Sequence, residues 1–330
     1  MNIKINNLNE NNATFKNTNF KSINLYKQKN KIIIFLLILI VFAFCLLSQI
    51  FKIKKLNKKI KNLDDLNSIL KKEIEAIFSY TNNSKNASCI YQLIKPMDVI
   101  GKQKVRIGKK GDGGYILLND FNNTRIAYSF GINNEISFEE DLATRDIEVY
   151  MYDHTINKIP KINPKFHWKK IGLTGKKVIN KDMKTLKELI KENGHINEKN
   201  MILKMDIEES EWEVFLYMNF DILRKFEYIL VEFHFENRYK SMYSKVFKKL
   251  NKTHQIFHLH CNNCGGMVNF DGHNICYSLE ISFVIKGKNT FMKSSENYPV
   301  KNIDYRNCNS KPEINNFLNI YQLDNIFSLY

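Results

Sequence analysis

The chain has 330 residues, of which 44% are hydrophobic and 25% charged, and its formal net charge is +16. This composition is ordinary for a globular protein and excludes a wholly disordered or fibrous chain. The positive charge comes largely from lysines spread through an Asn- and Ile-rich sequence, without an Arg-rich, Gly-aromatic RNA-binding motif. The sequence therefore argues against nucleic acid as a partner and suits anionic lipids or acidic partners at least as well.

The N-terminal part of the sequence predicts a membrane anchor. Residues 1–30 are polar and Asn-rich, which predicts a disordered tail. Residues 32–50 are almost wholly apolar, and about 20 such residues suffice to cross a bilayer as a helix. We therefore expect a transmembrane helix at 31–51 that contacts the lipid bilayer. A cleaved signal peptide fits poorly because the run is long and lacks a small-residue cleavage site; the alternative is a buried core helix.

A second helix is expected after the anchor. Residues 52–80 carry apolar residues at steps of three and four, which predicts one apolar stripe. This helix is either a coiled-coil stalk, which would make the protein a homodimer, or a single helix lying against the domain. Residues 81–88 are polar and break this pattern, and 81–94 is interpreted as a linker.

The orientation of the anchor rests on two weak signals. Lysines flank the apolar run on both sides, so the positive-inside rule does not decide. Four Asn-x-Ser/Thr glycosylation sequons and five of the six cysteines lie beyond the run, which favours an oxidising lumen. We expect a single-pass type II membrane protein of the ER or Golgi, with the globular domain lumenal.

Strands and helices alternate from residue 95 to 286, which predicts a mostly parallel sheet covered on both faces. After Lys286 the pattern fades, so 287–330 is predicted to be a tail. Ser137 is expected to cap the first helix, and Gly194 to end the second. The expected strands are 126–131, 147–152, 166–173, 201–205 and 227–235, with late antiparallel strands at 255–260 and 277–285; the expected helices are 137–143, 185–194, one from 211, and 239–250.

Three of the expected strands end in residues suited to a ligand. Gly131 ends the first strand and lets the chain pass close to a ligand, while Asp153, about twenty residues on, can hold ribose hydroxyls. The acidic run 206–211 follows the strand 201–205. Taken alone, this run could equally be a turn exposed to solvent. No Gly-x-Gly-x-x-Gly loop is present, which favours a nucleoside ligand without a pyrophosphate.

Taken together, these motifs resemble those of class I S-adenosylmethionine (SAM)-dependent methyltransferases, and more narrowly the FkbM-like and animal membrane-anchored methyltransferase-like proteins. The resemblance covers roughly residues 95–285 and is more specific for the fold than for the substrate. The motifs are Tyr128-Ser-Phe-Gly-Ile, Val149-Tyr-Met-Tyr-Asp-His-Thr, Leu203-Lys-Met-Asp-Ile-Glu-Glu-Ser-Glu-Trp and Leu230-Val-Glu-Phe-His-Phe, with Gly111-Asp-Gly-Gly-Tyr and Leu259-His-Cys-Asn-Asn-Cys-Gly-Gly for the narrower group.

The resemblance implies a doubly wound, Rossmann-like α/β sheet of seven strands and SAM as cofactor. It implies O- or N-methylation of an unknown small molecule, glycan or protein by a membrane-anchored enzyme. The residues it assigns to the cofactor are Phe130, Gly131, Asp153, His154 and Asp206. Those assigned to catalysis are Asp206, His234 and Glu208, and those assigned to the substrate rim are Glu211, Asp112 and His260.

The sequence departs from the family pattern at two places. Only Gly131 stands in a motif that usually holds several glycines, and Glu209 replaces the glycine of Asp-x-Glu-Gly-x-Glu. A side chain at 209 is expected to crowd the cleft or repel an acidic substrate. The alternative function is therefore a catalytically inactive methyltransferase fold with a scaffolding or recognition role. A third possibility, a nucleotide-sugar transferase, would require an Asp-x-Asp motif, and Asp64-Asp65 is not such a motif.

The late cysteines and histidines have two interpretations. His258, His260, Cys261 and Cys264 could ligate zinc, since Cys-x-x-Cys with nearby histidine suits that metal. A disulfide of Cys261 or Cys264, for example with Cys276, is as plausible in an oxidising lumen. We expect no metal.

Overall fold

The computed structural model describes residues 90–120, 123–270 and 273–315, together with Phe42, Cys45, Leu46, Ser48 and Gln49. The chain divides into two units, residues 1–78 and 79–330. The five residues between 42 and 49 are helical. The predicted disordered tail, the stalk, the rest of the transmembrane helix and the linker up to residue 89 lie outside the described residues. Within the described residues, no helix combines the length and the apolar character needed to cross a membrane.

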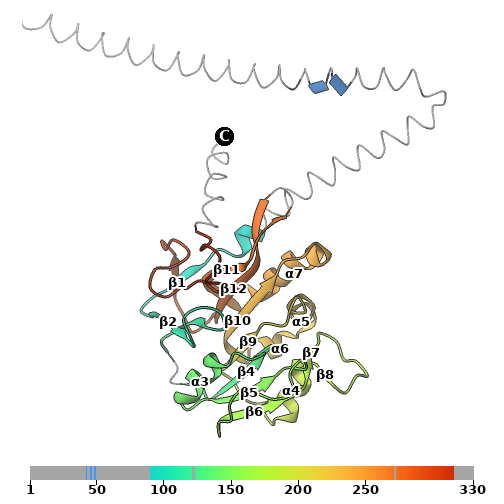
Figure 1. Ribbon diagram of the computed structural model, residues 1–330, viewed down its shortest axis with the longest axis vertical. Coiled ribbons are helices and arrows are strands. Elements are labelled where there is room, and N and C mark those ends of the chain that lie inside the picture. Colours follow the sequence, from blue (N-terminus) through green and yellow to red (C-terminus); the bar gives the residue numbers. More distant parts are fainter. Residues whose placement is uncertain are drawn as a thin grey trace, which may run out of the picture. The chain divides into compact units, whose positions relative to one another are not determined.

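A seven-stranded sheet organises the second unit (Figure 1). Its strand order is β11 (His254–Phe270), β12 (His273–Ile285), β10 (Phe226–His234), β9 (Met201–Met205), β4 (Ile126–Phe130), β5 (Glu148–Tyr152), β6 (Phe166–Lys169). Neighbouring strands from β10 to β6 run parallel, while β12 is antiparallel to both β10 and β11. The mostly parallel seven-stranded sheet that the resemblance implied is confirmed.

The strand order places a switch point between β4 and β9. From β4 the chain proceeds outward through β5 to β6, and it then returns to β9 and proceeds outward on the other side. In open α/β sheets, ligands bind at the carboxyl ends of strands where the order reverses in this way.

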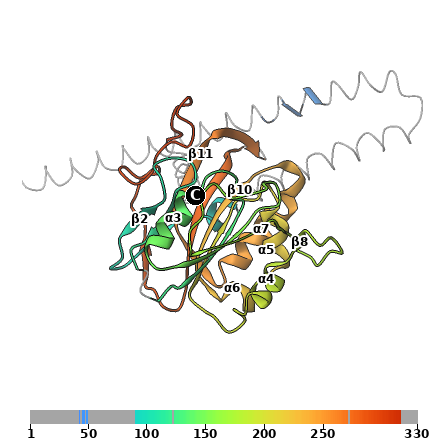
Figure 2. The same ribbon diagram turned by 60° about the horizontal axis from the view of Figure 1, so that its bottom comes forward.

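Both faces of the sheet are covered and therefore buried. Successive side chains of a strand point to opposite faces, so each strand contributes to both cores. In β4, Tyr128 and Phe130 join one core cluster and Ala127 joins the other. Helices α4 (Leu186–Glu192), α5 (Glu211–Tyr217), α6 (Phe220–Leu223) and α7 (Lys240–Leu250) cover the first face. Helix α3 (Ser137–Thr144) and the hairpin β2 (Lys104–Ile107)–β3 (Tyr115–Leu118) cover the second (Figure 2).

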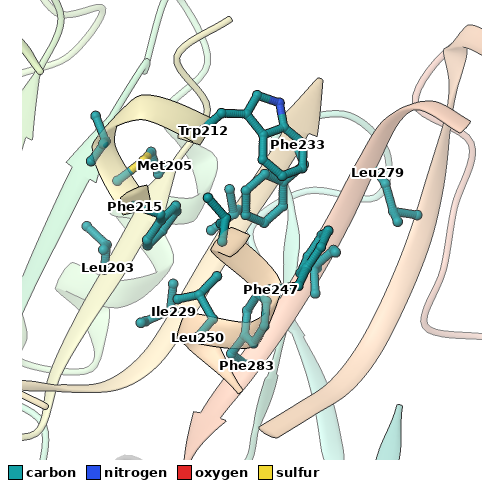
Figure 3. Packing of buried hydrophobic residues seen from close by; sticks show 14 of the residues in the cluster. Leu203, Met205, Trp212, Phe215, Ile229, Phe233, Phe247, Leu250, Leu279 and Phe283 are labelled. Carbon is teal, nitrogen blue, oxygen red and sulfur yellow. The ribbon is translucent and has the colours of Figure 1, made fainter. Parts of the chain in front are cut away.

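The first core is rich in aromatic rings. Trp212 lies 4.5 Å from Phe233 and 4.2 Å from Tyr243 between ring centroids, and the Trp212 indole N–H donates to the carbonyl of His234 at 2.6 Å. Figure 3 shows Trp212, Phe233 and Phe247 packed between the helices and the sheet. This packing holds the start of α5 against the end of β10, and both segments border the site described below.

Local sequence explains the helix ends. The α4 helix begins with a capping box in which Thr185 and Glu188 exchange hydrogen bonds, and it is followed by Gly194 at φ +79°. The cap predicted for Ser137 is wrong, because Ser137 is the first residue of α3. Its hydroxyl instead accepts a hydrogen bond from the Lys109 amide at 2.9 Å, while the Glu135 carboxylate accepts from the Ser137 amide.

The third predicted strand, 166–173, is interrupted. The β6 strand ends at Lys169, and the Ile171 amide bonds back to the Lys169 carbonyl. Gly172–Leu173 then forms β7, which pairs with β8 (Met183–Lys184) outside the main sheet. The backbone groups of Gly172 and Leu173 therefore pair with β8 and do not extend β6.

Residues 287–315, expected as a tail, contribute to the globular unit. Phe291–Lys293 forms β13, which pairs with β1 (Met97–Val99). Tyr298 is buried, and Cys308 is joined to Cys264 by a disulfide. This segment is held by single anchoring residues and so carries no apolar periodicity that the sequence could reveal.

Candidate active site

A cavity of about 690 Å³ opens at the carboxyl edge of the sheet, at the switch point between β4 and β9. Its volume lies in the range of about 300–1,000 Å³ that is usual for small-molecule sites. Of the residues predicted for the site, the lining includes Asp112, Phe130, Gly131, Asp153, His154, Asp206, Glu208 and His234. Eight residues separated by up to 122 positions therefore meet at one edge. Seven of them lie at or just after the ends of β4, β5, β9 and β10, and Asp112 comes from the β2–β3 hairpin.

The close contact between the ends of β4 and β9 requires a glycine at position 131. It has φ +71°, and a Cβ atom there would lie 1.5 Å from the backbone carbonyl oxygen of Asp206. The Asp206 amide in turn donates to the Phe130 carbonyl at 3.2 Å. The single glycine thus lets the ends of β4 and β9 approach each other, and this packing role is separate from the predicted contact with a ligand.

Asp153, at the tip of β5, is held by its neighbours. Its Oδ1 accepts from the amide and the hydroxyl of Thr155 at 2.7 and 2.6 Å, and its Oδ2 accepts from the Asn133 amide at 2.9 Å. Burial acts to raise the pKa of Asp153, but these hydrogen bonds outweigh burial and lower the pKa below its usual value. Asp153 is therefore a fixed carboxylate in the cavity lining.

His234 is buried and lies close to three glutamate side chains. Its Nδ1 lies 3.3 Å from Glu211, and its Nε2 lies 3.4 Å from Glu208 and 3.7 Å from Glu232. Burial acts to lower the pKa of His234, but Glu211 and the other acids raise it to about 9. The imidazole is consequently a cation at neutral pH.

Asp206 is affected chiefly by its removal from water. Burial raises the pKa of Asp206 to about 6, while the nearby charges of Lys204 and His234 act to lower it. A carboxyl group with a pKa near 6 is ionised at neutral pH and still basic enough to accept a proton.

Two predicted rim residues do not lie on the rim. Glu211 is fully buried, and its Oε1 accepts from the Ile207 amide at 2.8 Å, so it closes the turn from β9 into α5. His260 is 1% exposed and pairs with Glu280 at 3.0 Å and Glu313 at 3.5 Å. Neither residue is part of the cavity lining. The resemblance to the family motif placed Glu211 near the cleft but could not predict that its side chain turns inward.

Glu209 does not crowd the cleft, contrary to expectation. Glu208 and Glu209 have φ +52° and +76°, which explains why a glycine would suit position 209. The Glu209 carboxylate is mostly buried in an ion pair with Arg238, and Glu209 is absent from the cavity lining while Glu208 and Ser210 are present. The extra carboxylate is thus neutralised outside the site.

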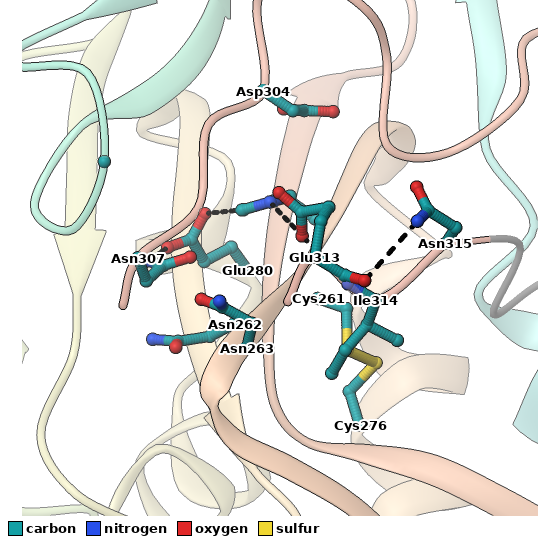
Figure 4. A network of polar contacts seen from close by, with 12 residues as sticks. Cys261, Asn262, Asn263, Cys276, Glu280, Asp304, Asn307, Glu313, Ile314 and Asn315 are labelled. Atoms are coloured by element: carbon teal, nitrogen blue, oxygen red, sulfur yellow. Dashed lines mark hydrogen bonds and ion pairs between the residues drawn. A yellow bond between two sulfur atoms is a disulfide. The ribbon is translucent and has the colours of Figure 1, made fainter. Parts of the chain in front are cut away.

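A polar row that the sequence did not predict crosses the sheet on the side of β10. Glu232 on β10 lies opposite Glu280 on β12, which lies opposite His260 on β11. Like charges opposite each other are destabilising, and burial raises the pKa of Glu232 well above its usual value. Asn262 donates to Glu232 at 2.8 Å, and Asn307 donates to Glu280 at 2.6 Å. Figure 4 shows Glu280 and Asn307 in this network.

The late cysteines form disulfides. Cys261 is bonded to Cys276, and Cys264 is bonded to Cys308. The zinc hypothesis is therefore wrong for Cys261 and Cys264, because neither thiol is free to ligate. His258 instead pairs with Asp304 at 2.8 Å.

Two buried charged residues of the lining, Lys204 and Glu139, were also missed. Lys204 donates to the carbonyls of Gly131 at 2.7 Å and Phe130 at 3.3 Å. Glu139 on α3 accepts from the Ser129 hydroxyl. The lysine interrupts an apolar strand, which is a usable signal; the glutamate sits in an ordinary amphipathic helix and has none.

Two groups in the described residues could offer three ligand atoms each to a metal ion, with these atoms within 4.8 Å of one another. They are Asp206, Glu211 and His234, and Asp112, Glu232 and Glu280. Oxygen-rich sets of this kind suit hard divalent cations such as Mg²⁺ or Ca²⁺. Acidic clusters are also common without an ion, and the expectation of no metal remains a prediction.

Comparison with known proteins completes the description of the site. A solved structure described as a SAM-dependent methyltransferase from Streptococcus mutans is similar to this chain at 9% sequence identity and a TM-score of 0.31. The similarity covers 56% of this chain and 55% of that one, so this chain spans about half the length of that protein. No curated protein matches the chain. A family model described as a methyltransferase domain matches residues 54–277, and because this match spans more than half of the sequence, the chain belongs to that methyltransferase family.

Proposed function

We propose that the chain is a SAM-dependent methyltransferase that binds its cofactor in the cavity at the carboxyl edge of the sheet. The observation that carries the proposal is the meeting of Gly131, Asp153 and Asp206, from the ends of β4, β5 and β9, in one cavity. In parallel α/β sheets this is the place where nucleoside ligands bind. The narrower relationship to the FkbM-like and animal membrane-anchored proteins is part of this proposal.

The cavity fits a cationic ligand. Although the chain carries a net charge of +16, acidic residues outnumber basic ones in the lining, and the ammonium of its one lysine, Lys204, donates to backbone carbonyls. The seven acidic residues of the lining are Asp112, Glu135, Glu139, Asp153, Asp206, Glu208 and Glu232. When bound, SAM supplies an electrophilic methyl group on a positively charged sulfonium. An acidic, partly buried cavity stabilises that charge.

Asp153 is the residue that we assign to the ribose. Its Oδ2 accepts one described hydrogen bond whereas Oδ1 accepts two, and a carboxylate oxygen has capacity for two. Oδ2 can therefore accept from a ribose hydroxyl without losing Asn133. Phe130 and His154 also belong to the cavity lining and complete the proposed cofactor contacts.

Asp206 is the residue that we assign as general base. With a pKa of about 6 it can accept the proton of an acceptor hydroxyl or amine at neutral pH. His234 is already protonated there because its pKa is about 9, so it serves as a fixed positive charge. Glu208, whose side chain is 84% exposed, stands at the cavity mouth where an acceptor enters.

The proposal is tested by calorimetric titration of SAM and S-adenosylhomocysteine into the full-length protein. We expect binding of both, weakened about tenfold or more by Asp153→Ala because a hydrogen bond to a charged group is lost. Asp221→Ala is the matched control, since Asp221 is 95% exposed on α6. Absence of binding to the unsubstituted protein would refute the proposal. Tight binding without turnover of hydroxyl or amine acceptors would favour the inactive alternative.

We also propose a single-pass type II membrane protein with the methyltransferase domain in the lumen of the ER or Golgi. The apolar run 32–50 motivates the anchor, and the two disulfides support an oxidising compartment. A homodimer through residues 52–80 belongs to the same proposal. Protease protection of the C-terminal domain in microsomes is the expected result, and digestion of that domain in intact vesicles would contradict it.

A further inference from the structure

The loop between β7 and β8, residues 174–182, projects from the body of the second unit (Figure 1 and Figure 2). Residues 176–182 are all exposed, and near their centre Ile179 is fully exposed and Val178 is 43% exposed. Single apolar side chains on a surface are ordinary. Within the part of the chain that the structure describes, however, these two are the only exposed large hydrophobic residues that adjoin in sequence.

The loop is held at both ends, so its tip stands on a fixed base. The pairing of β7 with β8 fixes where the loop leaves and rejoins the domain. Gly175 packs against α5, since a Cβ atom there would lie 2.5 Å from the Glu213 carbonyl oxygen. After the tip, the Asn180 side chain accepts from the Asp182 amide at 2.9 Å, and the Asn180 carbonyl accepts from the Met183 amide at 3.2 Å. The apolar pair is therefore presented by a hydrogen-bonded turn.

Positive charge surrounds the apolar tip. Three lysines less one aspartate give the loop a formal charge of +2. The Lys176 ammonium lies 4.1 Å from the centroid of the Tyr217 ring. The Lys177 ammonium approaches Glu188 only to 3.8 Å, which is longer than a hydrogen bond. The lysines that flank the tip are Lys176, Lys177 and Lys181.

A second exposed isoleucine shows what is particular to this loop. Ile162, between β5 and β6, is 89% exposed and also has lysines nearby. Those lysines are paired directly with carboxylates, Lys161 with Glu140 at 2.8 Å and Lys165 with Asp146 at 2.7 Å. Apolar exposure at Ile162 is therefore accompanied by neutralised charge, whereas the tip of the 174–182 loop combines apolar exposure with a net positive charge.

We propose that the 174–182 loop docks on an anionic lipid surface, with Val178 and Ile179 entering the headgroup layer and the three lysines contacting the anionic headgroups. Apolar burial and attraction to anionic lipid add together at such an interface, and each lysine close to it contributes about fivefold in affinity. An acidic protein would account for the lysines but not for the adjoining apolar side chains.

Docking of this loop has a consequence for the cavity. Leu173 and Met183, at the two ends of the loop, belong to the cavity lining. A docked loop therefore holds this side of the cavity next to the lipid. The inference goes beyond the proposed function, since it requires neither a cofactor nor the apolar run 32–50.

The test uses the full-length protein with a polarity-sensitive fluorophore at the tip, attached to Ile179→Cys in a Cys45→Ser, Cys89→Ser background. The matched control carries the fluorophore at Ile162→Cys. With phosphatidylcholine vesicles that contain phosphatidylserine, we expect the emission of the 179 probe to shift to the blue and to be quenched by brominated lipid. Vesicles of phosphatidylcholine alone should give a far smaller shift, and the 162 probe should show neither change.

Two further measurements address the charge. Replacing all three lysines by glutamine should abolish the shift of the 179 probe in anionic vesicles. Raising the salt concentration should do the same without any substitution, because exposed charges are screened. A shift that survives both changes would overturn the inference.

Other outcomes would overturn it as well. They are no shift in anionic vesicles, equal shifts at 179 and 162, and equal shifts in anionic and neutral vesicles. A shift produced by soluble polyglutamate and not by vesicles would assign the loop to an acidic protein and would also refute lipid docking. None of these results depends on cofactor binding, so the proposed function is tested separately.

Discussion

The two halves of the sheet are built on different principles. In the parallel half, from β6 to β9, the three residues that carry the proposed function follow the ends of their strands: Gly131 follows β4, Asp153 follows β5 and Asp206 follows β9. In the antiparallel half, the polar side chains lie within the strands, as Glu280 does in β12 and His260 in β11. The first half presents the residues that follow its strands to a ligand, whereas the second presents side chains on one face of a hairpin.

The two halves are also stabilised differently. The parallel half depends on apolar burial and on the close approach of β4 and β9 at Gly131. The antiparallel half contains two disulfides and buried histidine–carboxylate pairs, and two of the carboxylates, Asp304 and Glu313, come from the C-terminal segment. Substitutions in the two halves should therefore differ in size and in the conditions that reveal them.

The largest effect is expected at Gly131. Gly131→Ala should lower the free energy of unfolding by on the order of 4 kcal/mol, because overpacking against Asp206 adds to backbone strain. Gly194→Ala is the matched control, since φ there is +79° but nothing lies within 4 Å of the new Cβ, and about 1 kcal/mol is expected. Urea unfolding measures both, and equal costs would show that the strand contact is unimportant.

The next effect belongs to the antiparallel half. Replacing both Cys264 and Cys308 by serine should cost about 3 kcal/mol, because the bond closes a loop of 44 residues. Chemical unfolding under oxidising conditions is the measurement. Cys45→Ser, which touches neither disulfide, should leave the transition unchanged. A double variant as stable as the parent would show that the C-terminal segment is held by other contacts.

A smaller, pH-dependent effect is expected where the halves meet, at His234. Its pKa is raised to about 9 in the folded protein, above the usual 6.5, by Glu211, Glu232 and Asp206 after the opposing effect of burial. The folded state therefore retains a proton that the unfolded state releases between pH 6.5 and 9, and stability must fall as pH rises through that window.

His234→Gln should remove this slope. The variant should be less stable than the parent by on the order of 2 kcal/mol at pH 6.5, and this difference should shrink above pH 9. Unfolding curves recorded across the window test the point. A constant difference would mean that His234 acts by packing alone.

The smallest effect is expected outside the cavity, at Glu209. Glu209→Gly should be more stable than Glu209→Ala by about 1 kcal/mol, because both lose the Arg238 ion pair but only glycine relieves φ +76°. Thermal unfolding compares the two variants, and cofactor affinity should be the same in both. A loss of affinity in the alanine variant alone would bring Glu209 back into the site.

Sequence alone determined most of the parallel half. The strand 201–205 and the helix from 211 were predicted at their observed positions, because a continuous apolar run and a helical period record burial that is local in sequence. The edge at which Gly131, Asp153 and Asp206 meet followed from the alternation of strands and helices, since parallel strands end on one side. The resemblance to known motifs, rather than this alternation, supplied Asp112 and most of the other predicted lining residues.

Only the tertiary structure decided which distant segments meet. It turned Glu211 inward beneath His234, paired Cys264 with Cys308, and brought Asn307 to Glu280 from a segment without periodicity. It also brought Glu139 and Lys204, 65 positions apart in the sequence, into the lining of one cavity. Periodicity tells whether a side chain is buried, but the partner that neutralises a buried charge is set by packing between elements, and local sequence carries no record of it.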